Sequence, residues 1–260
     1  MKIATWNVNS VRTRLEQIIN WLTENYVDVL CLQETKVIDH DFPRIAFESL
    51  GYYPYISGQK SYNGVALISR QPLTDVNIGF GSILPDLASS WDEQKRVISG
   101  IFEGVRIVNL YVPNGSSIGS EKYEYKLSWL KILREYLQTL LLLNPDISLC
   151  GDFNIALEDI DINSQVKIAN HIMASEQERQ ALKDVISLGF ADAFRKFNSA
   201  GENYSWWDYR TAAFKRNLGW RIDHHYLTPS LYERAQSCII DIEPRKLVQP
   251  SDHTPVIVEF

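Results

Sequence analysis

The stretch Ile147-Ser148-Leu149-Cys150-Gly151-Asp152-Phe153-Asn154 reads as a buried strand that ends in two polar side chains. Its apolar run is short and is bounded by Pro145 and Gly151, which is typical of a core strand. Asp152 and Asn154 are two residues apart, so on an extended backbone their side chains point the same way. An Asx-type turn is the simpler interpretation. Whether this strand end is a turn or part of a site depends on what the other strands carry at their ends.

The segments on both sides of this strand predict one α/β domain. A strand pattern at 2–6, a helical pattern at 11–26 and a buried strand at 28–34 indicate a central sheet with helices packed on it. A hairpin and a long helix that begins at Ser120 follow, and the last third returns to strands. No linker or internal repeat separates these elements. The expected strands are 52–57, 64–70, 74–80, 97–102, 105–111, 222–228, 234–240 and 254–259, and the expected domain is 1–260.

Composition and charge limit the classes of protein. The chain has 260 residues, of which 45% are hydrophobic and 22% charged, as in an ordinary globular protein. Its three cysteines lie far apart without a CxxC motif, so we expect neither a disulfide framework nor a zinc site. The first residues enter a strand pattern directly, and no run is long and apolar enough for a membrane helix. We therefore expect a cytoplasmic monomer with no membrane partner.

Polar residues close several of the predicted buried strands. Each has a local explanation: Glu34 could pair with Lys36, Asp252 could cap a turn, and Asp223 could pair with Arg221. In sheet-based folds, however, ligand sites lie at strand ends, so together these residues predict one site. The set is Asn7, Glu34, Tyr111, Asp152, Asn154, Asp223, Asp252 and His253.

The residue types in this set select the chemistry. Carboxylates and amides without cysteine are hard oxygen ligands, which suit Mg²⁺, or Mn²⁺, better than zinc. The one histidine, His253, can be held as an imidazolium by a neighbouring carboxylate and can contact a phosphate oxygen. The sequence therefore predicts a metal-assisted attack of water on a phosphodiester.

Seven blocks of the sequence resemble, in order, the motifs of the exonuclease III family of apurinic/apyrimidinic (AP) endonucleases. One block is Val27-Asp28-Val29-Leu30-Cys31-Leu32-Gln33-Glu34-Thr35-Lys36, and the specificity lies in all seven blocks occurring in order. Ser10 departs from the pattern, because the family usually has glycine there. The other blocks are Trp6-Asn7-Val8-Asn9, Tyr111-Val112-Pro113-Asn114, Gly151-Asp152-Phe153-Asn154, residues 204–210, residues 217–223 and Ser251-Asp252-His253-Thr254-Pro255.

This resemblance implies a fold and an activity. The fold is a four-layer α/β sandwich of the DNase I-like type, in which two packed mixed β-sheets are flanked by helices. The activity is Mg²⁺-dependent hydrolysis of the phosphodiester 5′ to an abasic site in duplex DNA. Removal of 3′ blocking groups as a 3′-phosphodiesterase or 3′-phosphatase, and 3′→5′ exonuclease activity, accompany it. The implied substrate is double-stranded DNA with abasic sites or blocked 3′ ends, within base excision repair.

The resemblance also assigns roles to individual residues. Glu34 resembles the main metal ligand, with Asn7 and Asp252 close to the ion. Asp152 resembles the residue that orients or deprotonates water, and Asn154 the amide at the scissile phosphate; both are also counted with the metal site. The implied catalytic set is Tyr111, Asp152, Asn154, Asp223 and His253, and the implied DNA-binding set is Asn114, Trp206, Arg210, Trp220 and Ile222.

A chain of net charge −6 needs a local region of positive charge to bind DNA, and the segment 204–221 provides one. It carries four basic residues against Asp208, a local charge of +3, interleaved with aromatic side chains. Basic residues pair with phosphates, and aromatic residues can line a pocket for an extruded nucleotide. Trp207 could instead fill the core beneath the loop.

Three other classes of protein remain open at this point. A metal-dependent phosphatase acting on inositol phosphates or sphingolipids would share the acidic residues but would not need the aromatic, basic segment. The run Gly115-Ser116-Ser117-Ile118-Gly119 formally matches the nucleophile elbow of a serine hydrolase, although the expected helix cap is Ser120. An inactive DNA-binding protein would require a broken acidic cluster, and the cluster here is intact.

Overall fold

Strand β8 (Ile147–Asp152) lies inside a six-stranded sheet, and every one of its residues is buried. We describe a computed structural model, which covers residues 1–166 and 171–260. In the first sheet the strand order is β5 (Thr74–Ile78), β6 (Val97–Phe102), β7 (Val105–Tyr111), β8, β10 (Asp223–Leu227) and β9 (Ala191–Asp192). In the second it is β11 (Ser237–Ile240), β12 (Val256–Glu259), β1 (Lys2–Asn7), β2 (Val29–Gln33), β4 (Val65–Ser69) and β3 (Tyr53–Ser57).

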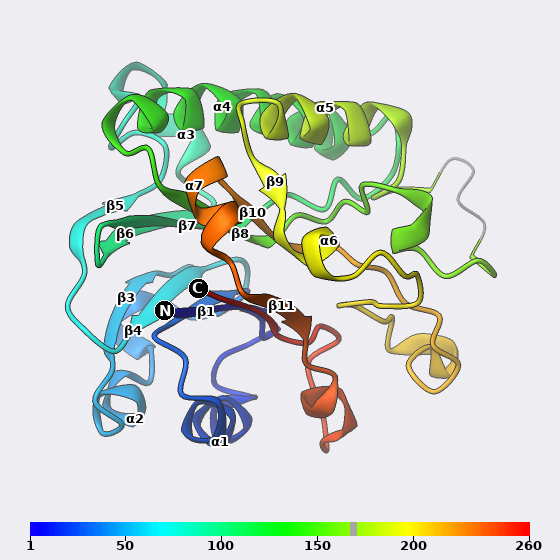
Figure 1. The fold of residues 1–260 in the computed structure, drawn as a ribbon, viewed down its shortest axis with the longest axis horizontal. Helices are drawn as coiled ribbons and strands as arrows, with labels where there is room; N and C mark the ends of the chain where they lie inside the picture. Colours follow the sequence, from blue (N-terminus) through cyan, green and yellow to red (C-terminus); the bar gives the residue numbers. More distant parts are fainter. Residues whose placement is uncertain (167–170) are drawn as a thin grey trace.

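The two sheets pack face to face, and helices cover both outer faces, which gives four layers (Figure 1). The helices α4 (Glu121–Leu143) and α5 (Glu176–Ile186) lie over the first sheet, and α1 (Leu15–Asn25) and α2 (Arg44–Glu48) over the second. Each sheet contains one parallel pair, β1 with β2 and β7 with β8, among antiparallel pairs. The predicted four-layer α/β sandwich with mixed sheets is therefore confirmed.

Short elements complete the chain. They are α3 (Ala88–Trp91), α6 (Ala193–Phe197), α7 (Pro229–Arg234) and the 3-10 turns Asp39–Asp41, Pro85–Leu87, Asp159–Asp161, Arg210–Ala212 and Glu243–Lys246.

None of the helices in the described residues is long and apolar enough to cross a membrane.

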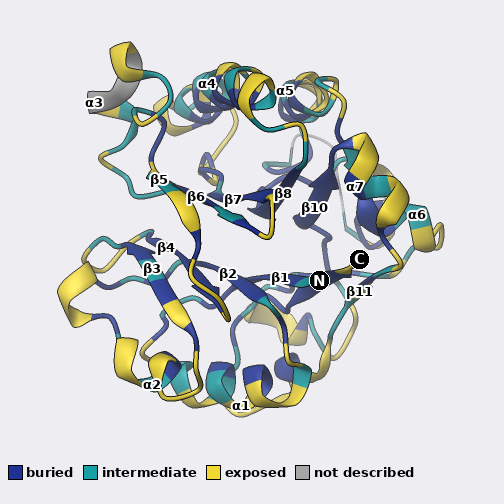
Figure 2. Cartoon of the chain, turned by 60° about the vertical axis from the view of Figure 1, so that its left-hand side comes forward, coloured by how far each residue is buried: buried dark blue, intermediate teal, exposed yellow. Residues whose placement is uncertain are grey.

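Apolar side chains fill the space between each pair of layers. The helices bury the side that faces their sheet and expose the other (Figure 2). Helix α4 begins where the sequence predicts, since the Ser120 hydroxyl accepts a hydrogen bond from the Tyr123 N–H. Its buried face includes Leu130 and Leu137, but it also contains a charged residue, Lys126, which the apolar periodicity did not indicate.

A polar contact crosses the apolar space between the sheets. The Gln33 side-chain amide at the end of β2 donates a hydrogen bond of 2.7 Å to the Asn109 side-chain oxygen on β7. The Asn109 amide in turn donates to the backbone carbonyls of Leu32 and Ala66, both at 2.9 Å. Because all these groups are buried, a slip of one sheet over the other would leave several of them unpaired, at a cost of roughly 1–3 kcal/mol each.

The registers of the strands bring the polar residues to one edge of both sheets. Asn7 pairs with Gln33 across β1 and β2, so Glu34 follows directly at the same edge. In the other sheet Asp152 lies between Tyr111 on β7 and Asp223 on β10.

Gly151 allows β8 to run close beside β7. Its φ is +144°, and a Cβ atom there would lie 2.0 Å from the Leu110 carbonyl oxygen. We expect Gly151→Ala to lower the free energy of unfolding by about 3 kcal/mol, because backbone strain and a steric clash add.

Urea denaturation measures this loss. The control is Gly104→Ala in the β6–β7 turn, where φ is +84° but, apart from the two chain neighbours, no described residue lies within 4 Å of the place a Cβ would take. Strain alone should cost about 1 kcal/mol there. Equal losses in the two variants would show that the close approach at Gly151 has no energetic weight.

Candidate active site

The loops that follow the strands hold unusual backbone conformations. Asn9, Ser10, Glu34 and Asn154 all have positive φ, at 44°, 94°, 50° and 50°. Such conformations cost energy in residues other than glycine, and they cluster at functional sites. The φ of Ser10 explains why glycine would suit this position, where the sequence departs from the family pattern.

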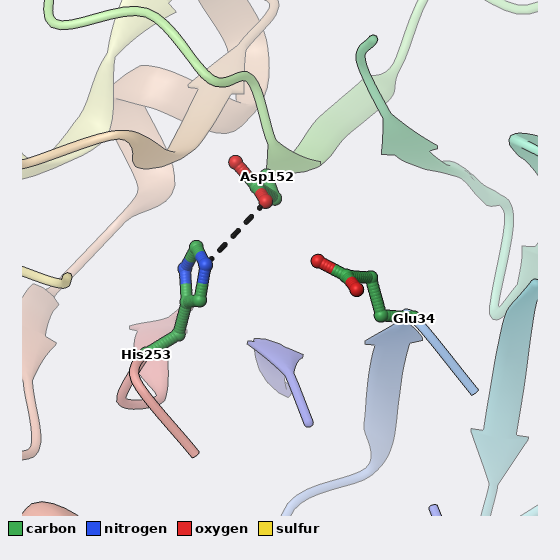
Figure 3. Close-up of side chains that lie close together, drawn as sticks. All are labelled: Glu34, Asp152 and His253. Atoms are coloured by element: carbon green, nitrogen blue, oxygen red, sulfur yellow. Dashed lines mark ion pairs between the residues drawn. The ribbon is translucent and has the colours of Figure 1, made fainter. Parts of the chain in front are cut away.

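Glu34, Asp152 and His253 lie at the centre of the site. One side-chain ligand atom from each lies within 4.8 Å of the others, and all three side chains point into the same space (Figure 3). The side-chain amide of Asn7 is buried beneath them and donates to both carboxylates, at 2.9 Å each. The Asn7 side-chain oxygen accepts the Asn9 N–H, so its nitrogen is the atom that faces the cluster.

A carboxylate–imidazole pair borders the cluster. The Asp223 carboxylate lies 2.8 Å from Nδ1 of His253, and Nε2 lies 3.6 Å from Asp152. Burial lowers the pKa of His253, but the charges of Asp223 and Asp152 outweigh it and raise the pKa to about 10. His253 is therefore an imidazolium at neutral pH. The alternative pairing of Asp223 with Arg221 is wrong, because Arg221 pairs with two other carboxylates.

The sequence left open whether Asp152 belongs to an Asx turn or to a functional site, and in the structure it does both. Its Oδ1 accepts the backbone N–H of Asn154 at 2.9 Å, which is the Asx turn. Its Oδ2 faces Asn7 and His253. Burial raises the pKa of Asp152 to about 7, although His253 acts against this rise. A carboxylate with such a pKa can accept a proton at neutral pH.

Glu34 is held as a carboxylate, and Tyr111 as a phenol. Burial raises the pKa of Glu34, but the Lys36 ammonium at 2.7 Å and the Asn7 amide outweigh it, so the pKa lies below its usual value. The local pairing of Glu34 with Lys36 is thus present as well. Burial, with the charges of Glu34 and Asp152, raises the pKa of Tyr111 well above its usual range.

A cavity of about 610 Å³ opens beside the cluster. Trp206 and Trp220 line it, and the indole N–H of Trp206 donates to Asp252 at 2.9 Å. The second oxygen of Asp252 accepts from Asn9. Asp252 thus lines the cavity next to the cluster without being one of its three closest members. Further apolar lining comes from Val166, Ile172, Met173, Ala213 and Leu218.

Two polar residues that the sequence predicted for the site, Asn114 and Asn154, line the cavity wall. The Asn114 side-chain amide donates to the side-chain oxygen of Asn154 at 2.9 Å, and Asn154 in turn donates to the Val112 carbonyl. Arg210 lies at the exposed rim, paired with Asp208 at 2.6 Å.

The structure does not place Ile222 on the cavity wall. It is 1% exposed and packs behind Trp220 in a small apolar cluster, so it supports the wall from behind. Trp207 likewise fills the core beneath the loop with Tyr204 and Ala213. Sequence position alone could not separate Trp206, which faces the cavity, from its neighbour.

The predicted positive charge of the segment 204–221 is smaller than its composition indicates. Arg221 is buried and forms ion pairs of 2.7 Å with Asp161 and Asp192. Its charge is neutralised inside the protein, where it cannot meet a phosphate, and Arg210 is partly neutralised by Asp208.

Two residues of the site were not predicted from the sequence. The His171 ring packs against Trp220 at a tilt of 41°, with ring centres 4.6 Å apart, and lines the cavity. It follows residues 167–170, which lie outside the described part of the chain. Lys126 reaches the backbone of Asn114 and Asn154 from beneath. The sequence contained one indication of this role, because a lysine at this position interrupts an otherwise apolar face of the helix.

Comparisons with known proteins agree with this geometry. The model of the endonuclease/exonuclease/phosphatase family matches residues 4–253. An exodeoxyribonuclease of Bacillus subtilis is 36% identical over 98% of both chains, and exodeoxyribonuclease III of Haemophilus influenzae is 33% identical over the full length of both.

Solved structures show the same fold over the whole chain. An AP endonuclease from Archaeoglobus fulgidus is 43% identical with a TM-score of 0.94, and a 3′ phosphatase from Neisseria bound to a product DNA hairpin is 41% identical with a TM-score of 0.95. Each comparison covers 100% of this chain and 99% of the other. The chain belongs to the endonuclease/exonuclease/phosphatase family and, within it, to the exonuclease III group of nucleases.

Proposed function

We propose that this protein is a DNA repair nuclease of the base excision pathway. It hydrolyses the phosphodiester 5′ to abasic sites in duplex DNA, removes 3′ blocking groups and degrades 3′ ends as an exonuclease. The observation that carries the proposal is the cluster of Glu34, Asp152 and His253, which lines one cavity together with Trp206 and Trp220. Relatives named as exodeoxyribonucleases, an AP endonuclease and a 3′ phosphatase support it.

The donor set fits a hard divalent cation. Glu34 and Asp152 offer carboxylate oxygens within reach of one another, and no cysteine of the chain is among the ligand atoms of this cluster. We propose Mg²⁺, with Mn²⁺ as a substitute, held mainly by the Glu34 carboxylate, with the Asp152 carboxylate close beside it. Asn7, Asn154 and Asp252 surround them, and their hydrogen bonds fix the geometry of the site. When bound, the cation would neutralise charge on the scissile phosphate.

The protein groups then divide the chemical work. Asp152 accepts the proton of the attacking water, a role that fits its place in the cluster, where its Oδ2 faces Asn7 and His253. Nε2 of His253 donates a charge-assisted hydrogen bond to a phosphate oxygen, while Asp223 keeps the ring protonated. The Asn154 amide and the Tyr111 hydroxyl, which line the same cavity, orient this phosphate.

DNA binding relies on the cavity and its rim. The abasic sugar, which lacks a base, would leave the duplex and enter the space between Trp206 and Trp220. Asn114 borders this path, and Arg210 would exchange Asp208 for a DNA phosphate. One copy of the chain, acting as a single domain over 1–260, carries all these groups, so we propose a monomer that works in the cytoplasm.

Two rival functions fit the structure less well. A phosphatase for inositol phosphates or lipids would use the acidic cluster but has no need of an indole-lined cavity beside it. A serine hydrolase is disfavoured because Ser117 is exposed and, among the described residues, its hydroxyl forms no hydrogen bond with a histidine.

The direct test is a 5′-labelled duplex with one abasic site, incubated with Mg²⁺ and, separately, with EDTA. We expect a single cut 5′ to the site with Mg²⁺ and none with EDTA. Glu34→Gln should lower kcat at least about 100-fold at saturating Mg²⁺, because it removes an anionic ligand.

Binding of Mn²⁺, followed by its EPR signal, separates ligation from other effects of this substitution. The matched control is Glu16→Gln, which removes an exposed carboxylate on α1. Unchanged Mn²⁺ affinity in Glu34→Gln would exclude Glu34 as a metal ligand.

A second prediction concerns the cavity wall. Trp220→Ala should reduce cleavage at an abasic site about 10- to 100-fold and reduce removal of a simple 3′-phosphate much less. The indole matters only when a sugar must be held outside the duplex. Trp220→Phe, which keeps an aromatic wall, serves as the control. If both reactions fell by the same factor, Trp220 would not be a pocket residue.

A third prediction concerns the protonation of His253. Asp223→Asn removes the charge that raises the His253 pKa most strongly, so that pKa should fall and the imidazolium should become partly neutral near pH 7. We expect kcat to drop about 100-fold at pH 8. The ratio of variant to wild-type kcat should rise as the pH falls, because acid restores the proton. Parallel pH profiles between about pH 5.5 and pH 9 would contradict this role of Asp223.

A further inference from the structure

A buried ion pair lies directly under the catalytic loops. Lys126 on α4 and Glu178 on α5 approach to 2.5 Å, and both side chains are 0% exposed. The ammonium uses all three of its hydrogens: one goes to Glu178, one to the Asn154 carbonyl at 2.8 Å and one to the Asn114 carbonyl at 3.1 Å. Lys126 thus joins the two loops that carry the site's amides.

Glu178 extends this network toward the cavity. Its carboxylate accepts the backbone N–H groups of Met173 and Ser175, both at 3.1 Å, and the Ser175 hydroxyl at 2.6 Å. Met173 lines the cavity wall. The start of α5, the cavity wall and the loops of Asn114 and Asn154 are therefore connected through one ion pair.

The position of Asn154 depends on this support. Asn154 adopts a left-handed backbone, which costs a non-glycine residue energy, and its carbonyl is the one Lys126 holds most closely. Its backbone N–H orients the Asp152 carboxylate, and its side chain meets Asn114. A small shift of this loop would move the proton acceptor and the phosphate-binding amide together.

Stability alone does not explain why an ion pair occupies this place. Replacing a buried ion pair by apolar residues of similar volume is often neutral or stabilising. An apolar pair, however, could not bind two backbone carbonyls of different loops at once. The ion pair is therefore better explained by the need to position the Asn114 and Asn154 loops than by packing of the core.

We infer that Lys126, paired with Glu178, is a positioning residue for the nuclease reaction: it fixes the Asn114 and Asn154 loops, and through them Asp152, in the geometry that cleavage requires. This inference rests on the proposed function. It adds to that function a residue that touches neither substrate nor metal.

The test compares Lys126→Met with the double variant Lys126→Met/Glu178→Gln. The single variant leaves a buried carboxylate unpaired and should lose both thermal stability and activity. The double variant removes the unpaired charge, while its amide oxygen can still accept the Met173 N–H, so it should regain most of the lost Tm. We expect its kcat to stay about 100-fold below wild type, with KM changed less than about threefold, because a displaced catalytic loop slows the chemical step.

A structural readout accompanies the kinetics. The side-chain amide NMR signals of Asn114 and Asn154 should shift in the double variant, since their contact depends on the Lys126 anchor. The matched control is Lys131→Met, which removes an exposed lysine from the same helix and should leave Tm, kcat and these signals unchanged.

Each result has a distinct meaning. If the double variant recovers kcat together with Tm, Lys126 is a packing residue and the inference is overturned. Unshifted amide signals in an active double variant would overturn it as well. If the wild-type protein itself fails to cut abasic DNA with any divalent cation, the proposed function fails instead.

Discussion

The hydrogen bond between Gln33 and Asn109 sets the relation of the two sheets on which the site depends. Apolar side chains alone let two sheets slide, because the hydrophobic effect has no direction. The observed arrangement satisfies the Gln33 nitrogen and both atoms of the Asn109 amide, and a displaced one would leave these buried groups unpaired. At the edge of this arrangement Asn7 of one sheet donates to Asp152 of the other at 2.9 Å. The catalytic cluster is thus an extension of the contact that aligns the sheets.

The cluster gathers more negative charge than a buried site can hold without compensation. Three groups provide that compensation: the Asn7 amide between the carboxylates, the Lys36 ammonium on Glu34, and the His253 imidazolium between Asp152 and Asp223. The charge that remains uncompensated is reflected in the pKa of Asp152, which burial raises to about 7. A divalent cation bound between Glu34 and Asp152 would compensate this charge.

The sequence predicted the strand-end residues because a local rule applies to each of them. A buried apolar run that stops at Glu34, or at Asp152, marks the edge of a sheet without knowledge of the rest of the chain. Side-chain direction in irregular segments follows no such period. Ile222 therefore could not be placed behind the wall, and Arg221 could not be recognised as a partner of Asp161. The role of Lys126 could not be predicted for a related reason: its buried partner Glu178 lies on another helix, far away in the sequence.

The charge counted over the segment 204–221 is a poor guide to how this protein meets DNA, because buried basic residues are neutralised by carboxylates from other parts of the fold. Arg221 is neutralised by two carboxylates and Lys126 by Glu178, so neither contributes to the field at the surface. The field that a phosphate meets is set by the groups that line the cavity, where low-dielectric walls focus it. There the acidic cluster repels DNA until a cation neutralises it, whereas Arg210 attracts DNA only when it leaves Asp208. Binding of the cation should therefore strengthen binding of DNA, because it neutralises the carboxylates that repel phosphates, and by thermodynamic reciprocity DNA strengthens binding of the cation equally.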